Sequence, residues 1–186
     1  MFLKSANVRF SIGMAKEVVT SMEMTDQGQL RPSRPSPQPI ELEEVGPCVA
    51  EALRSIYVRV WEPLASGGRM EWSVGDWETE LLRSGVKAWL PRVGGETVGL
   101  VELELEPTGD VGIVVFGLVP EFIGRGFGGA LLTSTVQLAW NMSSERPVRR
   151  VWVQTSSGDH PNAIANYKSR GFVVFQTQPK QAHGSR

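Results

Sequence analysis

The segment EFIGRGFGGALL, residues 121–132, places four glycines directly before an apolar pattern with helical spacing. Glycine keeps side chains away from the backbone, which suits close approach to a phosphate, a tight turn, or close packing of a helix on a sheet. A helix N-terminus with accessible amides attracts anions through its N–H groups and its dipole. The segment therefore predicts a phosphate-binding turn at the start of a helix.

The residues on either side indicate a strand before this turn and a helix after it. Residues 98–105 alternate in polarity, EPTGD supplies turn residues, and residues 111–119 form an apolar run. This pattern predicts an antiparallel hairpin whose second strand leads into the glycines. The apolar residues downstream predict a helix of about four turns; they are Phe127, Leu131, Leu132, Val136, Leu138 and Trp140.

The remaining elements complete an α/β pattern. We predict helices over residues 47–60 and 76–84, a strand over 148–155, a helix from Pro161 to Gly171, and a final strand over 172–178. Asp76 is expected to cap the second helix and Gly85 to end it. This order predicts an α/β fold with a mixed sheet and flanking helices.

The N-terminal part has a different character. RPSRPSPQP, residues 31–39, holds four prolines and favours extended backbone, so it predicts a linker or a strap. KEVVTSMEM before it is a candidate short strand. Residues 1–16 are expected to be a poorly ordered extension, or to precede a true start at Met14 or Met22. We therefore divide the chain into an extension (1–39), one globular domain (40–178) and a tail (179–186).

Charge and cysteine content exclude several classes of function. The net charge is −1 with scattered Lys and Arg, so nucleic acid is not expected as the main partner. Cys48 is the only cysteine, and His160 and His183 are far apart, so neither a disulfide nor a metal site is expected. Apolar runs are shorter than the roughly 20 residues of a membrane span, and the first residues lack a secretory pattern. We expect no membrane partner and a cytoplasmic location.

A dinucleotide-binding turn is an alternative explanation of the glycines. Gly124, Gly126 and Gly129 match the GxGxxG pattern. A Rossmann turn, however, has its first glycine directly after a strand of a βαβ unit. Here LVPEFI intervenes and an antiparallel hairpin comes first, which disfavours an NAD(P)-dependent oxidoreductase. A P-loop is excluded because no Gly-Lys-Ser or Gly-Lys-Thr follows.

Two segments together resemble the GNAT superfamily of acyl-CoA-dependent N-acetyltransferases: GLVPEFIGRGFGGALL and HPNAIANYKSRGF. The resemblance covers about residues 40–178 and is closest to a bacterial subgroup whose substrates are generally unassigned. Gly126 and Gly128 match the family's pyrophosphate loop, in which Ile123 replaces a Gln or Arg. The family's NxxAxxxYxxxGF helix is matched by Ala163, Tyr167, Gly171 and Phe172, and His160 replaces its asparagine.

The resemblance implies a GNAT-like mixed sheet whose central strands splay apart to hold the pantetheine arm of acetyl-CoA, the acyl donor. Backbone groups of Leu118 and Val119 would pair with that arm, amides of the glycine turn would hold the pyrophosphate, and Arg125 would add positive charge. The implied cofactor residues are Leu118, Val119, Ile123, Gly124, Arg125, Gly126, Phe127, Gly128, Gly129, His160 and Asn162.

The resemblance also suggests the catalytic groups. It makes Tyr167 the general acid that protonates the departing thiolate, and the alternative is a half-buried aromatic without a catalytic role. The base is less directly indicated. Glu102 and Glu104 project from one face of the hairpin strand and form either a base that faces the cleft or a solvated surface. The following strand lacks the glutamate that the family often uses, so Glu102 is our candidate base.

Acceptor choice is expected from aromatic residues between positions 57 and 77. Tyr57, Trp61, Arg69 and Trp72 are candidate substrate residues, and the alternative is that such residues close the core under a loop. The sequence thus predicts acetyl transfer from acetyl-CoA to a primary amine, on a small molecule or a protein, in a ternary complex. A non-catalytic acyl-CoA-binding module is the alternative, and a homodimer is left open.

Overall fold

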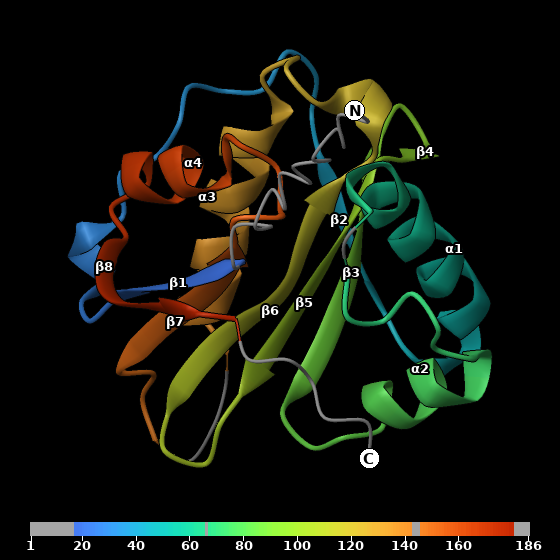
Figure 1. Cartoon of the computed structure of the whole chain (residues 1–186), viewed down its shortest axis with the longest axis horizontal. Helices are drawn as coiled ribbons and strands as arrows, with labels where there is room; N and C mark the ends of the chain where they lie inside the picture. Colours follow the sequence, from blue (N-terminus) through green and yellow to red (C-terminus); the bar gives the residue numbers. More distant parts are fainter. Residues whose placement is uncertain (1–16, 66, 143–145, 181–186) are drawn as a thin grey trace, which may run out of the picture.

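A mixed eight-stranded sheet forms the centre of the computed structural model, which describes residues 17–65, 67–142 and 146–180 (Figure 1). The strands are β1 (Val18–Met24), β2 (Glu41–Val45), β3 (Val86–Val93), β4 (Glu96–Thr97), β5 (Gly99–Leu105), β6 (Asp110–Leu118), β7 (Arg150–Ser156) and β8 (Val173–Pro179). Their order across the sheet is β2-β3-β5-β6-β7-β1-β8, and the short β4 pairs with β3. The predicted mixed α/β sheet with flanking helices is confirmed.

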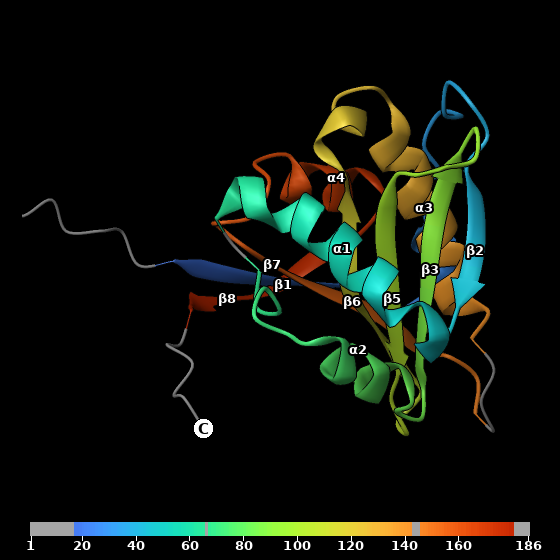
Figure 2. The same cartoon turned by 90° about the vertical axis from the view of Figure 1, so that its right-hand side faces the viewer.

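Helices cover both faces of this sheet (Figures 1 and 2). The α-helices in the described ranges are α1 (Ala50–Trp61), α2 (Val74–Leu81), α3 (Phe127–Trp140) and α4 (Ala163–Ser169). Helices α1 and α2 pack on β5 and β3, and α3 packs on β6 and β7 from the other side. Buried Leu53 and Ile56 of α1 and Leu131 and Val136 of α3 show that helical spacing in the sequence marked the core-facing sides.

Strands β6 and β7 form the one parallel pair among the described strand pairings. Only Asp110–Ile113 of β6 pairs with residues of β7, starting from Arg150 opposite Asp110 and ending at Val153 opposite Ile113. Beyond these four pairs the two strands part, although β6 continues to Leu118. The splayed central strands implied by the resemblance are therefore present.

The hairpin of β5 and β6 and the boundaries of α3, α4 and β8 agree with the sequence prediction to within a few residues. Helix α2 differs, because Ser73 is its N-cap and Asp76 lies at the third helical position, where both side chains complete a capping box. Strands β2 and β3 were not predicted. Pro91 interrupts the β pattern of β3. It pairs with Leu42 of β2, and on its other side it lies between the residues paired with β5 and those paired with β4, where that ladder is broken.

Strand β1 lies between β7 and β8 and is antiparallel to both, although it comes first in the chain. Met22 and Met24 of β1 are completely buried, so the candidate strand in the predicted extension forms and is part of the sheet. The expectations for residues 1–16 concern residues outside the described ranges, as does most of the predicted tail.

This position of β1 requires a long connection, because β2 lies at the opposite edge of the sheet. Residues 25–40 make the crossing past α4 and α3 (Figure 1). The predicted proline-rich linker is thus a strap, which we define as residues 31–37. It is anchored by the N–H of Arg31, which donates to the carbonyl of Arg170 (2.9 Å), and by the N–H of Ser33, which donates to Oγ1 of Thr133 (3.0 Å).

Gly171, directly after α4, supports the start of this crossing. It has φ +104°, and a Cβ atom there would lie 2.0 Å from the carbonyl oxygen of Gln29. We expect Gly171→Ala to lower the free energy of unfolding by about 1–3 kcal/mol from backbone strain alone, with the clash adding to it. Urea unfolding measures this. Gly46→Ala is the matched control, since a Cβ there would meet nothing within 4 Å; equal effects of both variants would contradict the assignment.

Candidate functional site

A cleft of about 1960 Å³ opens where β6 and β7 part. Residues 113–118 of β6 and 153–156 of β7 line it along the two strands. The first turn of α3, helix α4 and the strap form one part of its wall. The C-terminal half of α1 and the loop after it form another. The cleft therefore joins segments from distant parts of the described chain at the point where the central strands part.

The glycine turn opens onto this cleft. Gly124 (φ +75°) and Gly126 (φ +87°) both have left-handed backbone conformations that favour glycine, and Gly126 is the N-cap of α3. No side chain caps this helix, so its first-turn amides have no partner within the helix. Gly124, Gly126, Gly128 and Gly129 all line the cleft. Backbone N–H groups and the helix dipole at such a helix start favour an anion.

The strap and α4 add positive charge beside this turn. A Cβ atom on Gly129 would lie 2.5 Å from Nη1 of Arg170 and 3.1 Å from Cβ of Ser33, so the glycine lets both neighbours approach the helix start closely. The Nε atom of Arg170 is buried without a hydrogen-bond partner among the described residues. Arg34 of the strap also lines the cleft, and it forms no ion pair within the described part of the chain. Two arginines thus accompany the uncapped helix.

Some of the residues expected to bind the cofactor line the cleft and others do not. Leu118, Ile123, His160 and Asn162 line the cleft together with the four glycines. Val119 is not among the lining residues, and its N–H already donates to the carbonyl of Val98 (2.9 Å).

Two further cofactor candidates point elsewhere. The Phe127 ring is buried against Phe122, so only the backbone of Phe127 is near the turn. Arg125 is exposed outside the cleft lining, where its guanidinium stacks on Phe122 and donates to the carbonyl of Glu121. Arg34 and Arg170, rather than Arg125, therefore line the cleft beside the glycine turn.

Tyr167 of α4 lines the cleft with a largely buried ring, which contacts Phe116 of β6 and Phe172. Burial raises the pKa of its hydroxyl well above the usual value, and the nearby Asp159 carboxylate raises it further. The phenol is therefore protonated throughout the neutral range and can donate a proton or a hydrogen bond.

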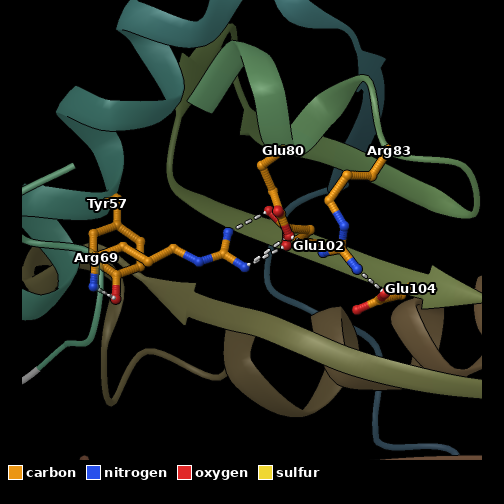
Figure 3. Close-up of polar contacts among 6 residues, drawn as sticks. All are labelled: Tyr57, Arg69, Glu80, Arg83, Glu102 and Glu104. Atoms are coloured by element: carbon orange, nitrogen blue, oxygen red, sulfur yellow. Dashed lines mark hydrogen bonds and ion pairs between the residues drawn. The ribbon is translucent and has the colours of Figure 1, made fainter. Parts of the chain in front are cut away.

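Glu102 is the buried end of an ion-pair network that reaches the surface at Arg83 (Figure 3). Its side chain is 0% exposed, and both of its carboxylate oxygens accept hydrogen bonds of 2.8 Å from Arg69. Arg69 also pairs with Glu80 (3.2 Å), which pairs with Arg83, which in turn pairs with Glu104. Burial raises the pKa of Glu102, and the Arg69 guanidinium opposes this rise. Glu102 is not among the residues that line the cleft.

The candidate acceptor residues divide into two groups. Tyr57 and Trp61 line the cleft and stack with ring centroids 4.3 Å apart. Arg69 lines it as well, and its N–H donates to the hydroxyl of Tyr57 (3.2 Å). Trp72 lies outside the lining and holds the Arg69 guanidinium at 4.3 Å from its ring centroid. Trp72 thus supports the wall that the other three form.

Several residues at the site were not predicted. Asp159, Arg170 and the strap residues Ser33 and Arg34 line the cleft, and the side-chain amide of Asn166 donates to the carbonyl of Gly128 (3.2 Å). Asn166 and Arg170 flank Tyr167 on one helix, so the helical motif could have indicated them. The strap residues carried no local signal, since their position depends on where β1 inserts. Within the described ranges no three metal-binding side chains come together.

The contribution of the Glu102 network to stability can be tested by replacing Arg69. In Arg69→Ala, Glu102 would stay buried without its counter-charge, so we expect a loss of about 3–5 kcal/mol in the free energy of unfolding. The loss should shrink as the pH is lowered from 7 towards 5, because protonation removes the uncompensated charge. Urea unfolding at several pH values measures both effects. Arg59→Ala, which removes an exposed pair with Glu121, is the control and should cost at most about 1 kcal/mol.

Solved structures share this fold. A functionally unknown conserved protein from Staphylococcus epidermidis has a TM-score of 0.63 at 16% identity, over 89% of this chain and 60% of that one. An acetyltransferase from Thermus thermophilus has 0.56 at 21% identity, over 76% and 97%. An aminoglycoside N-acetyltransferase in complex with CoA has 0.53 at 15% identity, over 83% and 98%. At these identities the likeness shows the fold.

The chain spans only 60% of the Staphylococcus epidermidis protein and 50% of a GCN5-related N-acetyltransferase from Sphaerobacter thermophilus. Among curated protein sequences none matches the chain significantly. No helix in the described ranges is long and apolar enough to cross a membrane.

The sequence profile described as the acetyltransferase (GNAT) family matches residues 50–172, which include β6, the glycine turn and Tyr167. The chain therefore belongs to the GNAT acetyltransferase family.

Proposed function

We propose that the protein transfers an acetyl group from acetyl-CoA to a primary amine, by direct attack in a ternary complex. The observation that carries the proposal is the uncapped, glycine-lined start of α3, which opens onto the cleft between the parted strands β6 and β7. A phosphate-bearing donor suits one part of this cleft, and Tyr167 lies in the same cleft with a proton to donate.

The residues present fit the acyl donor. First-turn amides of α3 suit a pyrophosphate, and Arg34 and Arg170 supply charge beside them. The backbone of β6 beyond Ile113 has no strand partner on the β7 side, which leaves polar groups available to an extended pantetheine arm. Leu118 is the predicted arm contact that lines the cleft.

Acetyl transfer needs a neutral amine, a place for the developing oxyanion, and a proton for the departing thiolate. A backbone N–H of β6 near Leu118 is suited to the oxyanion. Tyr167 is suited to the thiolate, because its raised pKa keeps the phenol protonated at the pH where the amine reacts. The carbon–sulfur bond then breaks as the carbon–nitrogen bond forms, and the products are an amide and CoA.

Glu102 was the base expected from the sequence. Its two oxygens are engaged by Arg69, so it could take a proton from an acceptor only if Arg69 released it. Its position favours instead a supporting role for the wall formed by Arg69 and Tyr57. The acceptor class of primary amines and a cytoplasmic location stay predictions, and a homodimer is left open.

Tyr167→Phe tests the catalytic assignment. We expect CoA binding, measured by calorimetry, to be retained while turnover falls roughly 10²-fold or more. Turnover is measured with acetyl-CoA and a panel of propylamine, tyramine, spermidine and kanamycin. Unchanged turnover would remove Tyr167 from the mechanism. If the wild-type protein acetylates none of these amines while CoA still raises its melting temperature, the result supports a non-catalytic acyl-CoA-binding module.

Replacing Arg34 of the cleft and replacing Arg125 of the glycine turn are expected to affect CoA affinity differently. Arg34→Ala removes a cation that lines the cleft, so we expect the Kd for CoA to rise roughly 10-fold. Arg125→Ala, which removes the exposed arginine of the turn, should leave the Kd within about twofold, since this side chain lies outside the cleft lining. Calorimetric titration with CoA distinguishes the two, and the reverse order of effects would return the phosphate contact to Arg125.

A further inference from the structure

Asp159 lies between β7 and α4 and lines the cleft with a half-buried side chain. Its Oδ2 atom accepts two hydrogen bonds, from Oγ1 of Thr155 (2.9 Å) and from the N–H of Ser156 (2.8 Å). Both donors are uncharged, and both belong to the end of strand β7, directly before the loop. They hold the carboxylate in one orientation without neutralising it.

The other carboxylates at the cleft are in different situations. Glu17 pairs with Lys180 (2.7 Å) and accepts a hydrogen bond from Ser156, so its charge is compensated. Glu62 is exposed to water at the end of α1. Asp159 has no ion pair with any residue in the described ranges. It is therefore the cleft carboxylate that combines partial burial with an uncompensated charge, and partial burial strengthens its attraction for a cation.

The cations of the cleft do not compensate for this charge. Arg69 is committed to Glu102 and Glu80, and Lys180 to Glu17. Arg34 and Arg170 belong to the part of the wall beside the α3 glycines. A positive group that enters with the acceptor would be the counter-charge that Asp159 lacks among the described residues.

The charge of Asp159 also acts on two tyrosine hydroxyls of the cleft. Burial is the main cause of the raised pKa values of Tyr167 and Tyr57, and the Asp159 charge contributes to both. The carboxylate is thus close enough to act on the hydroxyl of Tyr167, on the donor side, and on the hydroxyl of Tyr57, on the acceptor wall. An amine held by Asp159 would share the cleft with both hydroxyls.

We propose that Asp159 binds the ammonium group of the acceptor and takes the proton that must leave before the amine attacks the thioester. This inference rests on the proposed acetyl transfer. The ammonium gives one proton to Asp159, which passes it to water. The amine nitrogen then bonds to the acetyl carbon and the carbon–sulfur bond breaks. Tyr167 protonates the thiolate and recovers a proton from the new amide nitrogen, so the net products are amide, CoA and one proton.

The surroundings of Asp159 narrow the class of acceptor. Tyr57, Trp61 and Met70 line the same cleft and offer aromatic and apolar surface to the body of an amine. An acceptor with a carboxylate beside its amine would be repelled by Asp159, because no unpaired cation is found at the acceptor wall within the described residues. We infer an acceptor class of amines that are cationic at neutral pH and carry no adjacent acid, such as tyramine or spermidine.

The test is Asp159→Asn in the full-length protein. The asparagine oxygen can still accept from Thr155 and Ser156, so the turn should fold. For tyramine, spermidine and each other panel amine that the wild-type protein acetylates, we expect kcat/KM to fall about 10²-fold, with KM for the amine raised. The Kd for CoA and the melting temperature should stay at the wild-type values. Asp159→Glu should recover part of the loss.

Glu62→Gln, which neutralises an exposed acid of the same cleft, is the matched control and should leave kcat/KM within about twofold. Wild-type turnover by Asp159→Asn would overturn the assignment and leave acetyl transfer intact. Equal losses of CoA affinity, melting temperature and turnover would also overturn it, because Asp159 would then only support the turn. Absence of any turnover by the wild-type protein would overturn the proposed function and, with it, the role of Asp159.

Discussion

The end of pairing between β6 and β7 after Ile113 and Val153 is the constraint on which the rest of the site depends. Polar backbone groups at the centre of a sheet need partners, and the parted strands leave such groups facing a cleft. Because α3 follows β6 and α4 follows β7, both helices begin at this gap. One strand–helix unit thus supplies the glycine turn, and the other supplies Tyr167 and Asp159.

The insertion of β1 between β7 and β8 has a second consequence for the same cleft. The chain must return from β1 to β2 at the far edge of the sheet, and the strap makes this crossing over the start of α3 (Figure 1). Ser33 and Arg34 reach the cleft for this reason. The N-terminal strand therefore completes the sheet and also fixes part of the wall beside the glycine turn, so the fold and the site share one segment.

Two carboxylates near the cleft differ in whether a positively charged residue neutralises them. Glu102 is completely buried and is neutralised by Arg69 (Figure 3). The Arg69 guanidinium is itself held by Trp72. Such a pair fixes geometry, since moving either partner would leave a buried charge alone. Asp159 is half-buried and is held only by uncharged donors, so its charge is available to a cation that enters the cleft. The same chemical group thus serves two purposes in two environments.

Local patterns in the sequence were sufficient for the elements with strong periodicity. The β5–β6 hairpin, the glycine turn with α3, and the motif helix with Tyr167 could be predicted because their spacing and turn residues act over short distances along the chain. Strands β2 and β3 were missed, since Pro91 breaks the β pattern of β3 and is tolerated only where that strand changes neighbours.

The sequence by itself indicated a glycine turn suited to a phosphate and a tyrosine able to donate a proton, because backbone conformation and side-chain chemistry are local properties. Only the tertiary structure decided which charges meet. It paired Glu102 with Arg69, turned Arg125 outwards, brought Arg34 to the cleft, and left Asp159 without a counter-charge among the described residues. Charge compensation depends on distances between residues that lie far apart in the chain, and these distances follow from the order of the strands rather than from any local pattern.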